Sequence, residues 1–177
     1  MRLFIAIELP DDVTAHLRTL QKQLKTANAK QTFPSAFHLT LKFLGEVSPQ
    51  VADAVKASLS RLELKRFTAK LGGVGTFDRL SKPAVTWIAL EPNDKLHELQ
   101  TAVDDALTDE FPREQRFEPH VTLSRVKQIT NADAFRAVVR DLPVKPLTFD
   151  VNAIHLVQST LARSGPTYRT FHTVSFK

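Results

Sequence analysis

The sequence contains no cysteine, which excludes disulfide bonds and metal sites built from thiolates. It also lacks a long hydrophobic run, since none approaches the roughly 18 residues that a membrane-spanning helix requires. The apolar N-terminal segment in "MRLFIAIELPDD" is too short for a secretory signal, and acidic residues follow it at once. We therefore expect a cytoplasmic protein with no membrane partner.

The sequence has no basic tail, although its formal net charge is +5. Lysine and arginine are scattered along the 177 residues, which argues against nonspecific duplex binding. A positive charge suits a partner that carries phosphate groups, and it is equally compatible with an ordinary basic surface. With 42% hydrophobic residues, the chain can bury the core of one domain or of two small lobes.

Several catalytic and cofactor motifs are also missing. No G-x-S-x-G motif of a serine hydrolase is present, and no Walker or dinucleotide-binding pattern is met. Gly72, Gly73 and Gly75 lie between two β-like runs, where we expect a turn. The sequence therefore predicts no cofactor.

The two halves of the chain resemble each other. "FIAIELPDDV" from Phe4 is similar to "WIALEPNDKL" from Trp87, and "RFTAKL" has a β-like counterpart in "LTFDVN". His38 and His120 also lie about 82 residues apart, close to the spacing of the other pairs. Three features in one order at nearly one spacing indicate an internal duplication.

Hydrophobic periodicity predicts strands and helices in the same order in each half. Apolar and β-branched runs indicate strands, whereas apolar residues at helical spacing indicate helices. Ser48 and Asn131 are typical N-caps. The expected strands are 2–8, 38–44, 67–71, 84–90, 120–124, 147–157 and 169–176, and the expected helices are 10–24, 48–62, 94–110 and 131–142.

These elements predict an α+β fold in a single bilobal domain over residues 1–177. Each of two lobes related by a pseudo-twofold axis should contain an antiparallel sheet backed by helices. No linker separates the halves, and we expect the active cleft between the lobes.

Two short motifs, "HLTLKF" and "HVTLSR", carry the candidate chemistry. Because side chains alternate along a strand, His38, Thr40 and Lys42 should share one face, opposite Leu39, Leu41 and Phe43. The same alternation should place His120, Thr122 and Ser124 together. Each strand thus carries a histidine and a threonine on one face, about 7 Å apart at their Cα atoms. Both side chains can therefore contact the same small chemical group of a bound molecule.

Two imidazoles suit acid–base chemistry on a phosphodiester, since the pKa of histidine lies near neutral pH. One could deprotonate an attacking water while the other protonates the leaving oxygen. The alternatives are two sheet histidines with a structural role or part of a metal site, although no third ligand accompanies them at suitable spacing. His16 and His97 should be solvated on helices, and His155 and His172 should lie in the core or at the cleft rim.

The motifs resemble the paired His-x-Thr signatures of the 2H phosphoesterase superfamily. "RLFIAIELP" and "HLVQSTLARSGPTY" are similar to its RNA 2',3'-cyclic phosphodiesterase branch, also called 2'-5' RNA ligase. The resemblance implies a bilobal fold and metal-independent hydrolysis of RNA 2',3'-cyclic phosphate ends to 2'-phosphomonoesters. It also implies that His38 is the proton donor and His120 the proton acceptor, since symmetry alone leaves these roles open.

The resemblance further implies that Thr40 and Thr122 bind phosphate and that Arg125 contacts the substrate. By alternation Arg125 faces away from His120, so this role requires a strand end or a bulge; otherwise it is an exposed strand-end arginine. Phe43 stands at the corresponding place in the first motif.

The expected partner is RNA with 2',3'-cyclic phosphate ends, including tRNA fragments or nucleotides, and the protein is expected to be a monomer. Two other functions remain open: 2'-5' ligation of tRNA halves, and an RNA-end binding module without turnover.

Overall fold

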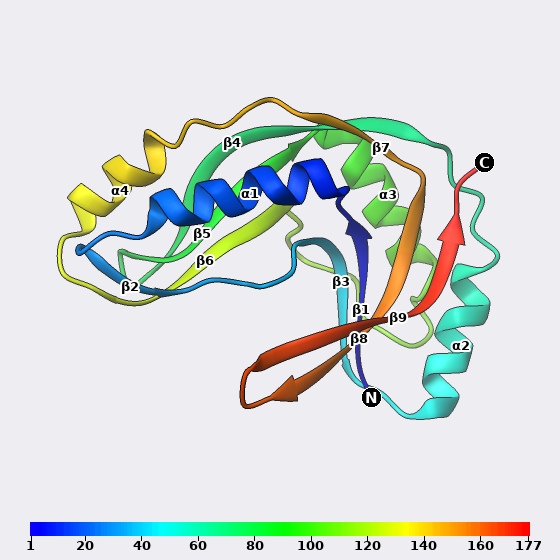
Figure 1. The fold of residues 1–177 in the computed structure, drawn as a ribbon. Coiled ribbons are helices and arrows are strands. Elements are labelled where there is room, and N and C mark those ends of the chain that lie inside the picture. Colours follow the sequence, from blue (N-terminus) through cyan, green and yellow to red (C-terminus); the bar gives the residue numbers. More distant parts are fainter.

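The computed structural model describes every residue from Met1 to Lys177. It confirms the predicted α+β fold, with four helices and two antiparallel sheets (Figure 1). The strands are β1 Arg2–Glu8, β2 Ala29–Thr32, β3 His38–Glu46, β4 Phe67–Arg79, β5 Lys82–Glu91, β6 His120–Ile129, β7 Thr148–Val151, β8 Ala153–Ala162 and β9 Gly165–Ser175. The helices are α1 Asp11–Leu24, α2 Pro49–Leu59, α3 Asn93–Ala106 and α4 Ala132–Arg140.

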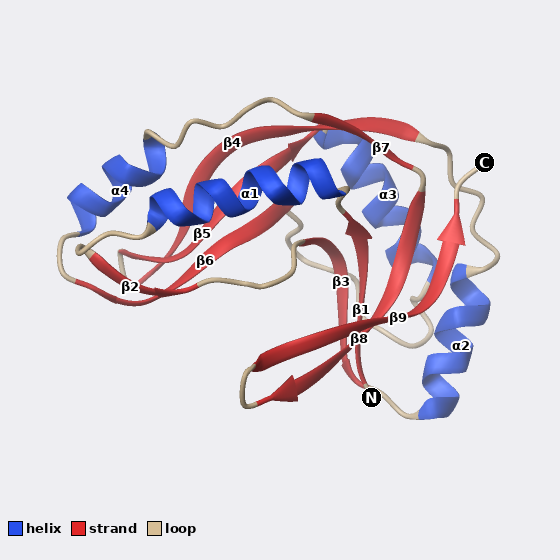
Figure 2. Ribbon diagram, in the orientation of Figure 1, coloured by secondary structure: helices blue, strands red, loops and turns tan.

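Each sheet takes strands from both halves of the chain. The four-stranded sheet has the order β3-β1-β8-β9, and the five-stranded sheet has the order β2-β6-β5-β4-β7. Helices α1 and α4 cover the five-stranded sheet, whereas α2 and α3 lie beside the four-stranded sheet (Figure 2). The lobes are therefore not the two sequence halves, because β2 and β4 of the first half lie in the five-stranded sheet, and β8 and β9 of the second half lie in the four-stranded sheet.

One continuous core joins the two sheets. It includes Ile5 and Leu39 of the four-stranded sheet together with Ile88 and Val121 of the five-stranded sheet, all fully buried. Phe4 belongs to a separate small cluster on the opposite face of β1. The large cluster thus marks the helix-covered face of each sheet.

The predicted caps are present. The Ser48 side chain accepts a hydrogen bond from the backbone N–H of Val51, and the Asn131 side chain accepts one from Ala134. Each cap satisfies an N–H that the first turn of its helix leaves unpaired. No helix combines the length and the apolar character needed to cross a bilayer.

Three local predictions are wrong. The single strand expected at 147–157 is two strands, β7 and β8, which lie in different sheets. Gly72, Gly73 and Gly75 lie inside the long strand β4, whose register against β5 shifts between Leu71 and Val74. Gly75 is required there because a Cβ atom would lie 2.5 Å from the Trp87 ring. The short strand β2 was not predicted, since its four residues show no hydrophobic alternation.

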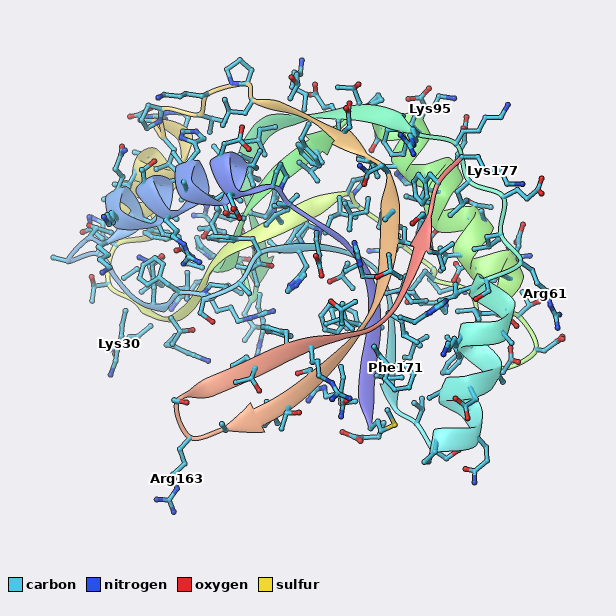
Figure 3. The ribbon with its side chains drawn as sticks, turned by 45° about the vertical axis from the view of Figure 1, so that its right-hand side comes forward. Lys30, Arg61, Lys95, Arg163, Phe171 and Lys177 are labelled. Carbon is cyan, nitrogen blue, oxygen red and sulfur yellow. The ribbon has the colours of Figure 1, made fainter.

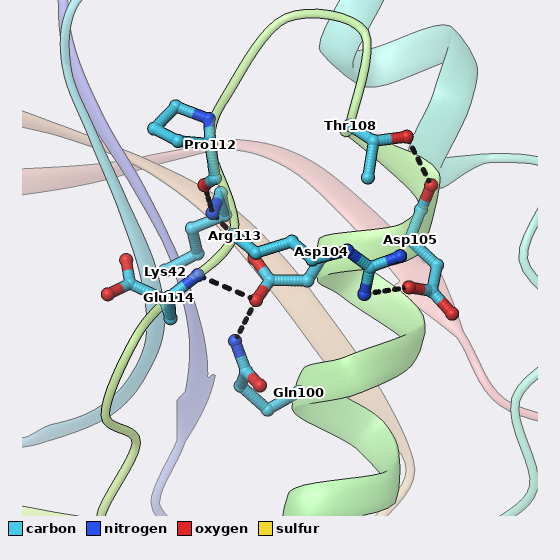
Figure 4. A network of polar contacts seen from close by, with 8 residues as sticks. All are labelled: Lys42, Gln100, Asp104, Asp105, Thr108, Pro112, Arg113 and Glu114. Atoms are coloured by element: carbon cyan, nitrogen blue, oxygen red, sulfur yellow. Dashed lines mark hydrogen bonds and ion pairs between the residues drawn. The ribbon is translucent and has the colours of Figure 1, made fainter.

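A buried ion pair links β3 to α3 and to the loop before β6 (Figure 4). The Lys42 ammonium lies 2.5 Å from a carboxylate oxygen of Asp104 and donates to the carbonyl of Pro112. The other Asp104 oxygen accepts from Gln100 and from the backbone of Glu114. Burial alone would raise the pKa of Asp104, but these hydrogen bonds outweigh it and lower the pKa.

Removal of Asp104 should destabilise the protein strongly. In Asp104→Ala, Lys42 is left charged and buried without its partner, and we expect a loss of about 3–5 kcal/mol in the free energy of unfolding. Replacing both partners, as Lys42→Met with Asp104→Leu, should recover much of this loss. The exposed pair of Lys95 and Glu98 is the control, and Lys95→Ala should change stability by less than about 1 kcal/mol in urea unfolding. Equal losses in Asp104→Ala and Lys95→Ala would contradict this prediction.

Candidate active site

A one-residue register shift divides each histidine motif into two parts. In β3, His38 pairs with Glu8 and Thr40 pairs with Ala6, but the next paired residue is Lys42, opposite Ile5. Leu41 is therefore an extra residue, as in a β-bulge. His38 and Thr40 share the face opposite the core, as predicted.

The second motif contains the equivalent shift. In β6, His120 pairs with Ala89 and Thr122 with Trp87, but Ser124 follows as the partner of Thr86, which leaves Leu123 extra. His120 and Thr122 consequently share the face opposite the core. The likeness of the two motif strands thus extends to the position of the extra residue, three places after each histidine.

The shift overturns the face predicted for the residues beyond each threonine. Lys42 is only 2% exposed and lies on the helix-covered face, whereas Phe43 is 68% exposed beside Phe4 on the motif face. Ser124 is buried on the core face and hydrogen-bonds to Thr86. Simple alternation fails here because the extra residue reverses the faces of the residues directly after it.

The same shift supplies the bulge that the prediction for Arg125 required. Arg125 pairs with Val85, which lies two residues from Trp87 on β5, so Arg125 shares the face of His120 and Thr122. Its side chain is exposed. Phe43 and Arg125 therefore occupy equivalent places, one apolar and one cationic, on the two motif faces.

Buried side chains of α1 and β2 stabilise the bulge in β6. The Gln21 amide donates to the carbonyl of the extra residue Leu123 at 3.0 Å, and Ser124 donates to Gln31 at 2.6 Å. These contacts satisfy backbone and hydroxyl groups that a bulge leaves without ladder partners.

The imidazole of His38 is half-buried among aromatic rings. The ring centroids of Phe4 and Tyr168 lie 5.5 and 5.1 Å from it, both in edge-on geometry. Burial lowers the pKa of His38; the neighbouring Glu8 carboxylate partly opposes this, and His155 lowers the pKa further.

Glu8 is held in place by β8 and β9. It accepts a hydrogen bond from Thr170 at 3.0 Å and lies 3.9 Å from the imidazole of His155. The other ring nitrogen of His155 forms a hydrogen bond of 3.1 Å with the hydroxyl group of Thr173. A carboxylate and a second imidazole thus surround the first motif, and the second motif has no such pair.

His120 has one ring nitrogen fixed by the backbone. Its Nδ1 lies 2.6 Å from the carbonyl of Glu118, and because a carbonyl only accepts, Nδ1 must carry the proton. In the neutral imidazole Nε2 is then a free acceptor. Phe77 packs edge-on against the ring at 4.9 Å.

The remaining histidines correct two predictions. His16 is only 9% exposed and accepts from the backbone N–H of Lys145, so it is not solvated. His97 is half-buried against Phe117. His172 hydrogen-bonds to Ser60 after α2 and lies away from His38.

Glu8 was not among the predicted site residues, although it lies directly opposite His38 in the sheet. The signal for Glu8 was its place on β1 in alternation with Phe4 and Ala6, on the face opposite Ile5 and Ile7. It required knowledge that β1 pairs with β3, which one sequence does not supply. No group of three or more His, Asp or Glu side chains is arranged to hold a metal ion.

The chain matches a known family over most of its length. A family model described as the 2'-5' RNA ligase superfamily matches residues 9–163. Among curated relatives, RNA 2',3'-cyclic phosphodiesterase of Aeropyrum pernix is 37% identical over 142 residues, which cover 78% of this chain and 81% of that protein. The protein of the same name from Thermotoga maritima is 30% identical over 100% of this chain and 96% of its own.

Solved structures share the fold. The crystal structure of TT0787 of Thermus thermophilus superposes with a TM-score of 0.80 at 28% identity, covering 99% of this chain and 98% of that one. Apo LigT of E. coli has a TM-score of 0.78 at 24% identity and covers 99% and 96%. Both likenesses extend over the two sheets and all four helices.

The environment of His38 predicts how its pKa responds to substitution. By NMR titration its midpoint should lie below the ordinary histidine value of about 6.5. Glu8→Gln should lower the midpoint further, because the carboxylate favours the imidazolium, whereas His155→Ala should raise it. The His38→Ala spectrum assigns the resonance, and an unchanged midpoint in Glu8→Gln would contradict the proposed influence of Glu8.

The lowered pKa of His38 also determines how its contribution to folding stability depends on pH. Since the folded-state pKa of His38 is below the unfolded value, the unfolded chain binds more protons between the two. The stabilising contribution is therefore complete above the unfolded value of about 6.5 and is lost as pH falls through the folded-state pKa.

Proposed function

Since this chain belongs to the 2'-5' RNA ligase superfamily, we propose that it hydrolyses RNA 2',3'-cyclic phosphate ends to 2'-phosphomonoesters without a metal ion. The curated relatives are RNA 2',3'-cyclic phosphodiesterases, and this chain is an enzyme of that kind. His38 and His120 are its proposed acid and base.

The observation that carries this proposal is the pair of equivalent bulged strands. β3 and β6 contact each other, and each presents its histidine and threonine on the face opposite the core. A pseudo-twofold relation between two imidazoles suits in-line attack at phosphorus, which needs a base on one side and an acid on the other.

The proposed step conserves atoms and protons. Nε2 of His120 removes a proton from water while the water oxygen bonds to phosphorus. The bond from phosphorus to the ribose O3' breaks, and His38 transfers a proton to O3'. The products are a 2'-phosphomonoester and a 3'-hydroxyl, and the two imidazoles exchange their protons with solvent before the next turnover.

The surroundings of each imidazole support this division of roles. The carbonyl of Glu118 holds Nδ1 of His120 protonated, so Nε2 accepts. Burial lowers the pKa of His38, which makes its imidazolium a stronger acid, while a bound phosphate anion and Glu8 favour protonation. The resemblance to the family independently implies the same assignment.

Thr40, Thr122 and Arg125 complete the proposed site. They share the motif faces with the two histidines, so hydroxyl groups and a guanidinium can donate to the non-bridging phosphate oxygens. Structures of E. coli LigT with phosphate and with 3'-AMP show that the shared fold accommodates such groups in that protein.

An assay in excess EDTA tests the chemistry. The substrate is an oligonucleotide with a 2',3'-cyclic phosphate, and the product should be the 2'-phosphomonoester. His38→Ala and His120→Ala should each lower kcat by about 10²–10⁴-fold. His172→Gln is the matched control, because His172 faces α2 and should leave kcat unchanged.

Other outcomes separate the alternative functions. A 3'-phosphate product, or full activity in both alanine variants, would contradict the proposed mechanism. Tight binding with no product indicates a binding module. Adding a fragment with a 5'-hydroxyl tests ligation, in which that hydroxyl replaces water, and a joined product would reveal it.

A further inference from the structure

A two-stranded ribbon projects beyond the four-stranded sheet. β1 pairs with β8 as far as Ser159, and the following residues of β8 pair only with β9. We call residues Thr160–Thr167, with the turn at Arg163 and Ser164, the β8–β9 arm. Nearly all of its side chains are exposed, and Figure 3 shows Arg163 at its tip, directed away from the body of the protein.

One face of the arm continues the surface around His38. Tyr168, whose ring lies 5.1 Å from the His38 ring, pairs with Ser159, and Leu161 pairs with Pro166 on the same face. Leu161 is 70% exposed, and it shares this face with the exposed Pro166 and Tyr168. An apolar strip therefore runs from His38 toward the tip of the arm.

The charged side chains of the β8–β9 hairpin at its outer end are all positive. No aspartate or glutamate occurs after Asp150, whereas Arg163 and Arg169 lie on the hairpin. Arg169, Thr160 and Thr167 lie on the face of the ribbon opposite the apolar strip, whereas Arg163 and the exposed Ser164 form the turn at its tip. Cations, hydroxyls and an exposed apolar strip are the groups that contact the phosphates, riboses and bases of single-stranded RNA.

The substrate can extend from the site in one direction only. A cyclic phosphate terminates the 3' end, so all remaining nucleotides lie on its 5' side. From Tyr168 to the turn the arm extends roughly 10 Å at about 3.4 Å per residue. That length spans about three stacked nucleotides.

We infer that the β8–β9 arm binds the RNA strand immediately 5' to the cyclic phosphate. The strip of Tyr168, Pro166 and Leu161 packs against bases, and Arg163 pairs with a backbone phosphate. The inference rests on the proposed function and adds to it where the RNA beyond the terminal nucleotide is bound, since a mononucleotide does not reach the arm.

The test compares a 2',3'-cyclic mononucleotide with an octamer that ends in the same nucleotide. For the wild-type protein, kcat/KM should be higher for the octamer, and a length series should level off near four nucleotides. Arg163→Gln should lower kcat/KM for the octamer about fivefold at 0.1 M salt and reduce the salt-dependence slope by about 0.7, the effect of one single-strand phosphate contact. Leu161→Ser should also lower it, and neither change should affect the mononucleotide.

Arg61→Gln is the matched control, because Arg61 is an exposed arginine near the end of α2, far from the arm (Figure 3). Equal losses in Arg61→Gln and Arg163→Gln would overturn the inference, since they would report net charge alone. Equal kcat/KM for both substrates would contradict RNA binding by the arm and leave the proposed function intact.

Two further outcomes would each overturn the inference for a different reason. Hydrolysis of neither substrate would overturn the proposed function and the arm with it. If the arm variants keep octamer kinetics but sediment as a smaller species than the wild type, the arm binds a second copy of the chain, which also overturns the inference.

Discussion

The candidate site depends on one constraint, the extra residue in each motif strand. Without the shift at Leu41, Phe43 would point into the helix-covered core and Lys42 would lie on the motif face. Without the shift at Leu123, Arg125 would face away from His120. Each bulge keeps the histidine and threonine in place while it reverses the faces of the residues directly after the extra one, so one strand serves both the core and the site.

The reversed residues explain why the bulges persist in a packed protein. Lys42 reaches the core face, where Asp104 and the Pro112 carbonyl neutralise and bind its ammonium group. In the other lobe Ser124 takes this place, and Gln21 satisfies the carbonyl of the extra residue. The two lobes thus satisfy equivalent irregularities with different chemistry, one ionic and one neutral, as a duplicated fold permits after its halves diverge.

The sequence predicted the parts that depend on local pattern. Alternation placed His38 with Thr40 and His120 with Thr122, and the caps at Ser48 and Asn131 needed only their own helices. Alternation failed after each threonine, because a bulge is a relation between two strands and becomes visible only when the pairing is known. The distribution of the strands of each half over both sheets was hidden for the same reason.

The two imidazoles occupy equivalent places on their strands, and their neighbours differ in a way that suits the two proposed roles. In the aligned repeats Glu8 corresponds to Glu91, yet Glu8 lies beside His38, whereas Glu91 forms an ion pair with Lys70 at 3.2 Å. His120 instead has its Nδ1 proton directed to the Glu118 carbonyl. A carboxylate beside one imidazole favours its protonated form, and a carbonyl at Nδ1 of the other leaves Nε2 free to accept. The proposed acid and base therefore differ through contacts outside the two motifs, which is why the motifs alone could not distinguish them.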